Sequence, residues 1–131
     1  MIGLDTNVVV RYVMQDDPKQ APKATRILES LTVDDPGFMS LVSLVELVWV
    51  LASCYDLDRD RVGQAVDALL RTKELILDRA ELVAQALRIF RSGSADFADC
   101  LIERCASNAG CGQTLTFDRS AAKSAGMTLI A

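Results

Sequence analysis

Short apolar segments alternate along this chain with longer segments of helical periodicity, and this alternation limits the possible folds more than any other feature. The predicted strands cover residues 1–4, 38–41, 75–77, 113–117 and 127–130. Strands that alternate with helices usually form a parallel sheet with helices on both faces. We therefore predict a single α/β domain over residues 1–131, a three-layer α/β/α fold around a central, mainly parallel sheet of four to five short strands.

The helices expected between these strands are amphipathic or apolar segments bounded by capping and turn residues. The first of them opens at residues 16–18 and runs to about residue 31. The others cover residues 43–54, 59–70, 79–90, 96–109 and 119–124. Pro18 suits the first turn of the first of these helices. Thr6 and Asn7, directly after the first strand, also suit the start of a helix or a turn.

The segment 43–54 is apolar on nearly every side of a helix, with Glu46 as its only charge. One stripe consists of Leu44, Leu47, Val48 and Leu51, and a second of Val45, Trp49 and Ala52. Such a helix is either fully buried or shared with another chain. We expect the sheet to cover one stripe and the other to be a homodimer interface or a partner groove, unless neighbouring helices cover both.

Cysteine and histidine usage excludes several kinds of chemistry. The four cysteines form no C-x-x-C pair and the chain has no histidine, which excludes a Cys/His zinc site and the Ser-His-Asp and Cys-His mechanisms. Free thiols are typical of a reducing cytoplasm, and we predict a cytoplasmic protein without a signal peptide. The apolar stretch 36–55 is interpreted as a buried strand and helix, because Glu46 lies in its middle.

Four carboxylates lie where α/β folds usually place their chemistry. Asp5 ends the first predicted strand and Asp118 follows the fourth, so both are expected at the carboxyl edge, where such sheets bind ligands. Glu46 lies in the apolar helix, and Asp99 lies one turn into another helix, three residues after Asp96.

Each acid also has a purely structural interpretation. Asp5, Asp96 and Asp118 suit helix N-caps, and for Asp96 capping is the leading interpretation. The pattern Ser43-x-x-Glu46 fits a capping box. Asp99 is harder to explain in this way, because it stands inside its helix beside apolar residues.

Taken together, the acids favour a metal site. Several buried like charges raise one another's pKa and destabilise a fold unless a cation lies among them, and no Lys or Arg closely flanks Asp5 or Glu46 in sequence. Mg²⁺ or Mn²⁺ with oxygen ligands would neutralise them. Such an ion activates water and neutralises charge on a phosphodiester, so the pattern indicates phosphoryl transfer or hydrolysis.

Four motifs in this order resemble the PIN-domain family, and most closely its VapC-type toxins of toxin–antitoxin pairs. They are MIGLDTNV at residues 1–8, SLVEL at 43–47, DFADCLI at 96–102 and TLTFDR at 114–119. Each motif is weak alone, whereas all four together at this chain length are fairly specific. The resemblance spans nearly the whole chain.

The resemblance implies a Mg²⁺- or Mn²⁺-dependent endoribonuclease that is inhibited by a cognate antitoxin and is commonly a homodimer. It assigns Asp5, Glu46, Asp99 and Asp118 as catalytic, metal-binding acids. It assigns an orienting or substrate-positioning role to Thr6, Asn7, Ser43, Asp96 and Thr116.

A net charge of −4 is unusual for a protein that binds RNA. Without the four site acids and Asp96, however, 13 of the 18 acidic residues remain against 14 basic ones, a balance of +1. The basic residues Arg11, Lys19, Lys23 and Arg26 are candidates to flank the cleft, although such residues often form only a solvated helix face. The acidity is therefore weak evidence against a nucleic-acid substrate.

Three alternatives remain open. A catalytically silent PIN-like scaffold would keep the fold without the activity. A phosphoacceptor receiver module needs an Asp after a middle strand, but Asp56 and Asp58 follow a predicted helix, and Lys123 lies in a short terminal one. A haloacid-dehalogenase-like phosphatase usually carries D-x-D, and Asn7 occupies the second acidic position here.

Overall fold

The computed structural model describes all 131 residues, which form two compact units, Met1–Ala80 and Glu81–Ala131. All five predicted strands are present, and every strand pair is parallel, which confirms the α/β fold class. The strands form two sheets instead of the one predicted, with three strands in the first unit and two in the second. The prediction of a single domain stays a prediction, and each unit is described by itself.

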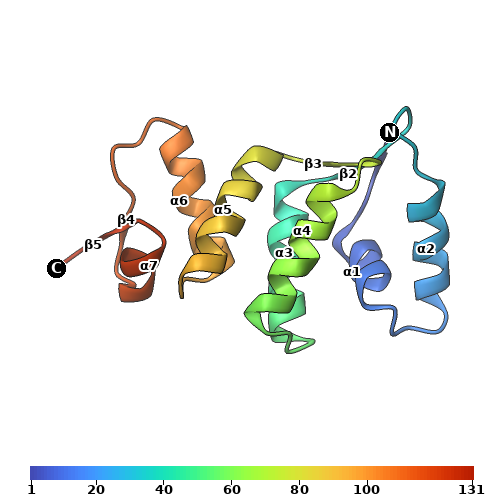
Figure 1. The fold of residues 1–131 in the computed structure, drawn as a ribbon, viewed down its shortest axis with the longest axis horizontal. Coiled ribbons are helices and arrows are strands. Elements are labelled where there is room, and N and C mark those ends of the chain that lie inside the picture. Colours follow the sequence, from blue (N-terminus) through green and yellow to red (C-terminus); the bar gives the residue numbers. More distant parts are fainter. The chain divides into compact units, whose positions relative to one another are not determined.

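The first unit is a three-stranded parallel sheet with two helices in each connection (Figure 1). Strand β2 (Gly37–Met39) lies between β1 (Ile2–Gly3) and β3 (Leu75–Leu77). Helices α1 (Thr6–Met14) and α2 (Gln20–Ser30) connect β1 to β2, whereas α3 (Leu41–Ser53) and α4 (Arg59–Arg71) connect β2 to β3. Helix α1 packs against both α2 and α3, so the end of β1 lies close to α3.

Helix α1 is the main element that the sequence pattern does not predict. Its valine run, Val8 to Val10, disfavours a helix, because β-branched side chains lose rotamer freedom there. Two features outweigh this preference. The carboxylate of Asp5 caps the first turn, and Val9 and Val10 are buried in the core.

Helix α3 begins two residues earlier than predicted, at Leu41, because Ser40 is its N-cap. Its stripe of Leu44, Leu47, Val48 and Leu51 is buried, as expected for the core side. On the other side, Trp49 is 61% exposed and Val42 is 80% exposed, while Ala52 is also exposed and Val45 is half-buried. Neighbouring helices therefore do not cover both stripes.

The second unit begins one residue into α5 (Ala80–Ser92) and also contains α6 (Phe97–Asn108), β4 (Leu115–Thr116), α7 (Arg119–Ser124) and β5 (Thr128–Leu129). Phe90 of α5 and Phe97 of α6 pack edge to face, with ring centroids 5.8 Å apart. Strands β4 and β5 pair in parallel through the connection that contains α7. No helix in the chain is long and apolar enough to cross a membrane.

Candidate active site

The first unit contains a pocket of about 560 Å³ on its surface, formed by α1, α3 and the residues after α3. Asp5, Thr6 and Asn7 line it at the start of α1, and Glu46 lines it from α3. We refer to it as the acidic pocket. Two acids that are far apart in sequence, Asp5 and Glu46, therefore share one cavity.

Asp5 has a structural role in this pocket, and part of its carboxylate is left free. Its Oδ1 accepts a hydrogen bond from the backbone N–H of Thr6 at 2.7 Å, as part of the N-cap of α1. Its Oδ2 accepts no hydrogen bond from the protein, and the residue is exposed. The capping interpretation of Asp5 is thus confirmed, and one oxygen stays available to a ligand.

Glu46 has no capping role, so the interpretation of Ser43-x-x-Glu46 as a capping box is wrong. The cap is Ser40, whose Oγ accepts a hydrogen bond from the backbone N–H of Ser43 at 3.2 Å. The hydroxyl of Ser43 is also within 3.2 Å of Ser40 Oγ. Glu46 lies beyond the first turn, is exposed and forms no hydrogen bond or ion pair with the protein. No structural requirement of α3 explains this carboxylate.

The second unit holds the other predicted acids at the starts of two helices. Asp96 caps α6, and its Oδ1 accepts a hydrogen bond from the backbone N–H of Asp99 at 2.7 Å. Asp118 caps α7, and its Oδ1 accepts from Ser120 N at 2.8 Å. The hydroxyl of Thr116 accepts from the backbone N–H of Asp118 at 3.0 Å and helps to hold this turn.

In the second unit, the carboxylates of Asp96 and Asp118 act electrostatically on that of Asp99. The pKa of Asp99 is raised above its ordinary value, mainly because the side chain is partly desolvated, and further because the charges of Asp96 and Asp118 lie near it. The structure thus gathers Asp96, Asp99 and Asp118 into one negative region. No basic residue contributes to the shift of Asp99.

The expectation that the site acids are buried is wrong for most of them. Asp5, Glu46, Asp96 and Asp118 are exposed, and only Asp99 is half-buried. Three of these acids are caps, and helix starts at the surface keep their carboxylates in water. The fold therefore does not depend on a cation to offset several buried charges.

The acids match a hard divalent cation in chemistry but do not by themselves complete a site within either unit. Carboxylate oxygens are the ligands that Mg²⁺ and Mn²⁺ prefer. Asp5, Asp96 and Asp118 each use Oδ1 for capping and have no protein hydrogen bond at Oδ2. In neither unit do three or more acidic or cysteine side chains converge closely enough to hold one metal ion.

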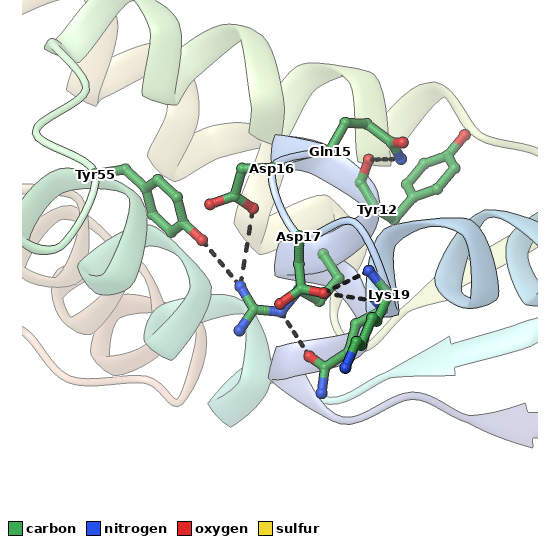
Figure 2. A network of polar contacts seen from close by, with 8 residues as sticks. Tyr12, Gln15, Asp16, Asp17, Lys19 and Tyr55 are labelled. Atoms are coloured by element: carbon green, nitrogen blue, oxygen red, sulfur yellow. Dashed lines mark hydrogen bonds and ion pairs between the residues drawn. The ribbon is translucent and has the colours of Figure 1, made fainter.

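A tyrosine in the acidic pocket was missed by the sequence pattern. The hydroxyl of Tyr55 accepts a hydrogen bond from Arg11 Nη1 at 3.2 Å, and Asp16 Oδ1 lies 3.8 Å from the same nitrogen (Figure 2). Partial burial, followed by the nearby Asp16 carboxylate, raises the pKa of Tyr55. Tyr55 follows the end of α3, and no motif marks that position.

The remaining predicted residues take different places. Thr6 is the one buried polar residue of the chain, at 6% exposure, and its backbone N–H contacts Asp5. Asn7 is exposed and faces the acidic pocket together with Arg11. Of the four basic residues expected to flank a cleft, Arg11 lines the acidic pocket, and both Arg11 and Lys23 line a smaller neighbouring pocket.

The comparison with protein families identifies the class to which this fold and these acids belong. The model of the PIN domain matches residues 2–126, nearly the whole chain and parts of both units. The chain therefore belongs to the PIN-domain family, whose members are generally nucleases. A comparison with curated proteins gave no match.

Proposed function

We propose that this protein is a Mg²⁺- or Mn²⁺-dependent endoribonuclease in which Asp5, Glu46, Asp99 and Asp118 are the metal-binding acids. The observation that carries the proposal is the acidic pocket, which Asp5 and Glu46 both line although more than forty positions separate them in sequence. Glu46 supports it most directly, because it is an acid in an otherwise apolar helix and has no structural partner.

The second unit supplies the other half of the proposed donor set. Asp99 lies in the field of two further carboxylates, which disfavours its charged form and would be relieved by a cation. A divalent ion bound to these acids would lower the pKa of a bound water and neutralise charge on the phosphodiester.

The residues around the acids have separate roles in this proposal. Arg11 lies in the acidic pocket with Asn7 and supplies positive charge for the RNA backbone. Thr116 holds the backbone at Asp118, and Thr6 holds the carboxylate of Asp5 through its N–H. Asp96 orients the first turn of α6, on which Asp99 lies.

The toxin role and its partners belong to the same proposal. The exposed side of α3 forms an apolar groove of about 560 Å³, lined by Leu41, Val42, Val45, Glu46 and Trp49. Exposed apolar patches on soluble proteins commonly bind other chains. We propose that this groove binds the cognate antitoxin or a second copy of the chain. The four cysteines form no disulfide, which suits the proposed cytoplasmic location.

Cleavage of defined RNAs in the presence of Mg²⁺, Mn²⁺ or a chelator tests the activity. The wild-type protein should cut RNA only with a divalent ion, and should leave single-stranded DNA of the same sequence intact. Asp5→Asn, Glu46→Gln and Asp99→Asn should each abolish cleavage. Asp34→Asn, which changes an exposed acid outside the pocket, should cleave like the wild type.

The controls separate the proposal from its rivals. Circular dichroism should show that the inactive variants are folded, because Asn at position 5 also caps a helix and neither Glu46 nor Asp99 is a cap. A folded wild-type protein that binds RNA but cuts none with either metal would favour the silent scaffold. Equal cleavage of RNA and DNA would correct the substrate class, and full activity of the acid variants would overturn the assigned residues.

A further inference from the structure

A second, smaller pocket lies between α1 and α2 in the first unit, with a volume of about 210 Å³. Its polar residues are Asn7, Arg11, Gln20 and Lys23, and the remaining lining residues are apolar. No carboxylate lines it, and its two charged lining residues, Arg11 and Lys23, are both basic, although the carboxylates of Asp16 and Asp17 lie near Arg11. We refer to it as the basic pocket.

The two pockets are neighbours, because Asn7 and Arg11 line both. On one side of these residues are the carboxylates of Asp5 and Glu46, and on the other is the ammonium group of Lys23. A ligand that extends from one pocket into the other would meet the proposed catalytic acids first and then a positively charged cavity.

Arg11 is held in place by the protein and still has a free side. Its Nε donates to Gln20 Oε1 at 2.7 Å, and its Nη1 donates to the hydroxyl of Tyr55 at 3.2 Å. Asp16 is the only carboxylate paired with it, at a long 3.8 Å. The guanidinium has five N–H donors, and no protein contact uses Nη2. These contacts orient the guanidinium in advance, so that little conformational freedom is lost on binding.

Lys23 differs from Arg11, because no other residue of the protein contacts its ammonium group. The residue is exposed on α2 and forms no hydrogen bond or ion pair. An isolated surface lysine is ordinarily only a solvated residue. Lys23, however, lies at a hollow shared with an oriented arginine and two amide side chains, Asn7 and Gln20. Such a set of donors is suited to the oxygens of a phosphate group.

We propose that the basic pocket binds the phosphate of an RNA nucleotide that flanks the cleaved bond, through Arg11 and Lys23. This inference rests on the proposed ribonuclease function and extends it to a second phosphate of the same strand. The pocket is below the range of about 300–1,000 Å³ typical of whole small-molecule ligands, and its size suits one charged group. A strand with regularly spaced phosphates would place one at the acids and another at Lys23.

RNA binding can be measured without cleavage in an Asp5→Asn background, with a short fluorescent single-stranded oligouridylate as the probe. Lys23→Gln should weaken binding several-fold and reduce the slope of log affinity against log salt by about 0.7, the value for one contact on a single strand. Lys73→Gln is the matched control. It removes the same charge from another exposed lysine of the same unit, outside all described pockets.

The position of the contact is tested by replacing single phosphates of the probe with neutral methylphosphonates. One linkage near the cleaved bond should be sensitive, and at that linkage Lys23→Gln should cause no further loss of affinity. Arg11→Gln should show the same pattern, and Arg11→Lys should recover part of the affinity. Circular dichroism controls for folding, and Lys23, as an exposed residue, is expected to tolerate the change.

The outcomes separate this inference from the proposed function. If the wild type cleaves RNA while Lys23→Gln and Lys73→Gln bind alike, the basic pocket is not a phosphate site and the ribonuclease proposal stands. If Lys23→Gln alone loses affinity but no RNA is ever cleaved, the pocket is a phosphate site and the ribonuclease proposal fails. If the Asp5→Asn protein and the wild type both fail to bind RNA, both proposals are overturned.

Discussion

The carboxylate of Asp96 and the backbone N–H of Asp99 form a hydrogen bond of 2.7 Å that joins two acids across the first turn of α6. The same bond that caps the helix therefore keeps one carboxylate near the other. Together with Asp118 and partial burial, this proximity raises the pKa of Asp99. The first turn of α6 is therefore stabilised by the cap and, at the same place, destabilised by repulsion between carboxylates.

The repulsion predicts a pH dependence of stability in the metal-free protein. Folding raises the pKa of Asp99 above its ordinary value of 3.8, so the native state binds its proton more tightly than the unfolded state does. The free energy of unfolding should therefore fall as the pH rises from about 3.8 through the raised pKa. Asp99→Asn should be more stable than the wild type at pH 7 in the presence of a chelator.

Urea unfolding at a series of pH values measures this effect. The advantage of Asp99→Asn should shrink as the pH is lowered toward 3.8, where the wild-type carboxyl is also neutral. Asp34→Asn, the exposed acid used above as a control, should show no such trend. A constant difference between Asp99→Asn and the wild type at all pH values would contradict the electrostatic explanation.

The proposed metal site predicts stabilisation by divalent ions that does not depend on any RNA. An ion that binds only the native state adds about 2.7 kcal/mol to the free energy of unfolding at 100 times its Kd. Thermal unfolding with Mg²⁺ or Mn²⁺ should thus show a rise in Tm for the wild type. Asp5→Asn and Asp118→Asn, which keep a capping side chain, should lose most of this rise. A Tm that saturating metal leaves unchanged argues against the site.

The start of α3 gives a prediction that separates two capping schemes. Because Ser40 is the cap, Ser40→Ala should cost about 1 kcal/mol of stability. Ser43→Ala should cost less, since the hydrogen bond that Ser43 donates comes from its backbone N–H. Glu46→Gln should leave the stability nearly unchanged. If Ser43→Ala were the more damaging change in chemical denaturation, the cap would have to be reassigned.

The two sides of α3 should respond differently to mutation. Leu47 is fully buried, and Leu47→Ala should cost about 2–5 kcal/mol. Trp49 is 61% exposed, so Trp49→Gln should change the stability of the isolated chain by less than about 0.5 kcal/mol. Light scattering should show that Trp49→Gln weakens the proposed self-association or the binding of the proposed antitoxin. Unchanged assembly in both experiments would mean that this face is not an interface.

The strands, most helices and several caps could be predicted because their causes are local. Asp96 and Asp118 cap the helices that immediately follow them, as side-chain chemistry alone suggests. Helix α1 could not be predicted in the same way. Its stability comes from burying Val9 and Val10 against other elements, which outweighs the weak helical preference of valine.

The candidate site shows the same division between local and long-range causes. The motifs indicated Asp5 and Glu46, but only the packing of α1 against α3 brings the two into one pocket. Tyr55 is joined to the pocket by a hydrogen bond with Arg11, which is 44 positions away in sequence. Burial of the acids was wrongly expected, because the sequence does not show which side of a helix start faces water.

The different roles of the two carboxylate oxygens in the capping aspartates have a genetic consequence. At Asp5, Asp96 and Asp118, helix formation uses Oδ1 and leaves Oδ2 unoccupied. Asparagine keeps an acceptor for the helix and removes the negative charge, so a single Asp→Asn replacement can silence the chemistry without unfolding the chain. Under the proposed function, a cell that expresses such an allele would accumulate an inert protein that still binds the proposed partners of the active one. If a limiting partner is the proposed inhibitory antitoxin, such inert copies would occupy it and leave more of the wild-type chain uninhibited.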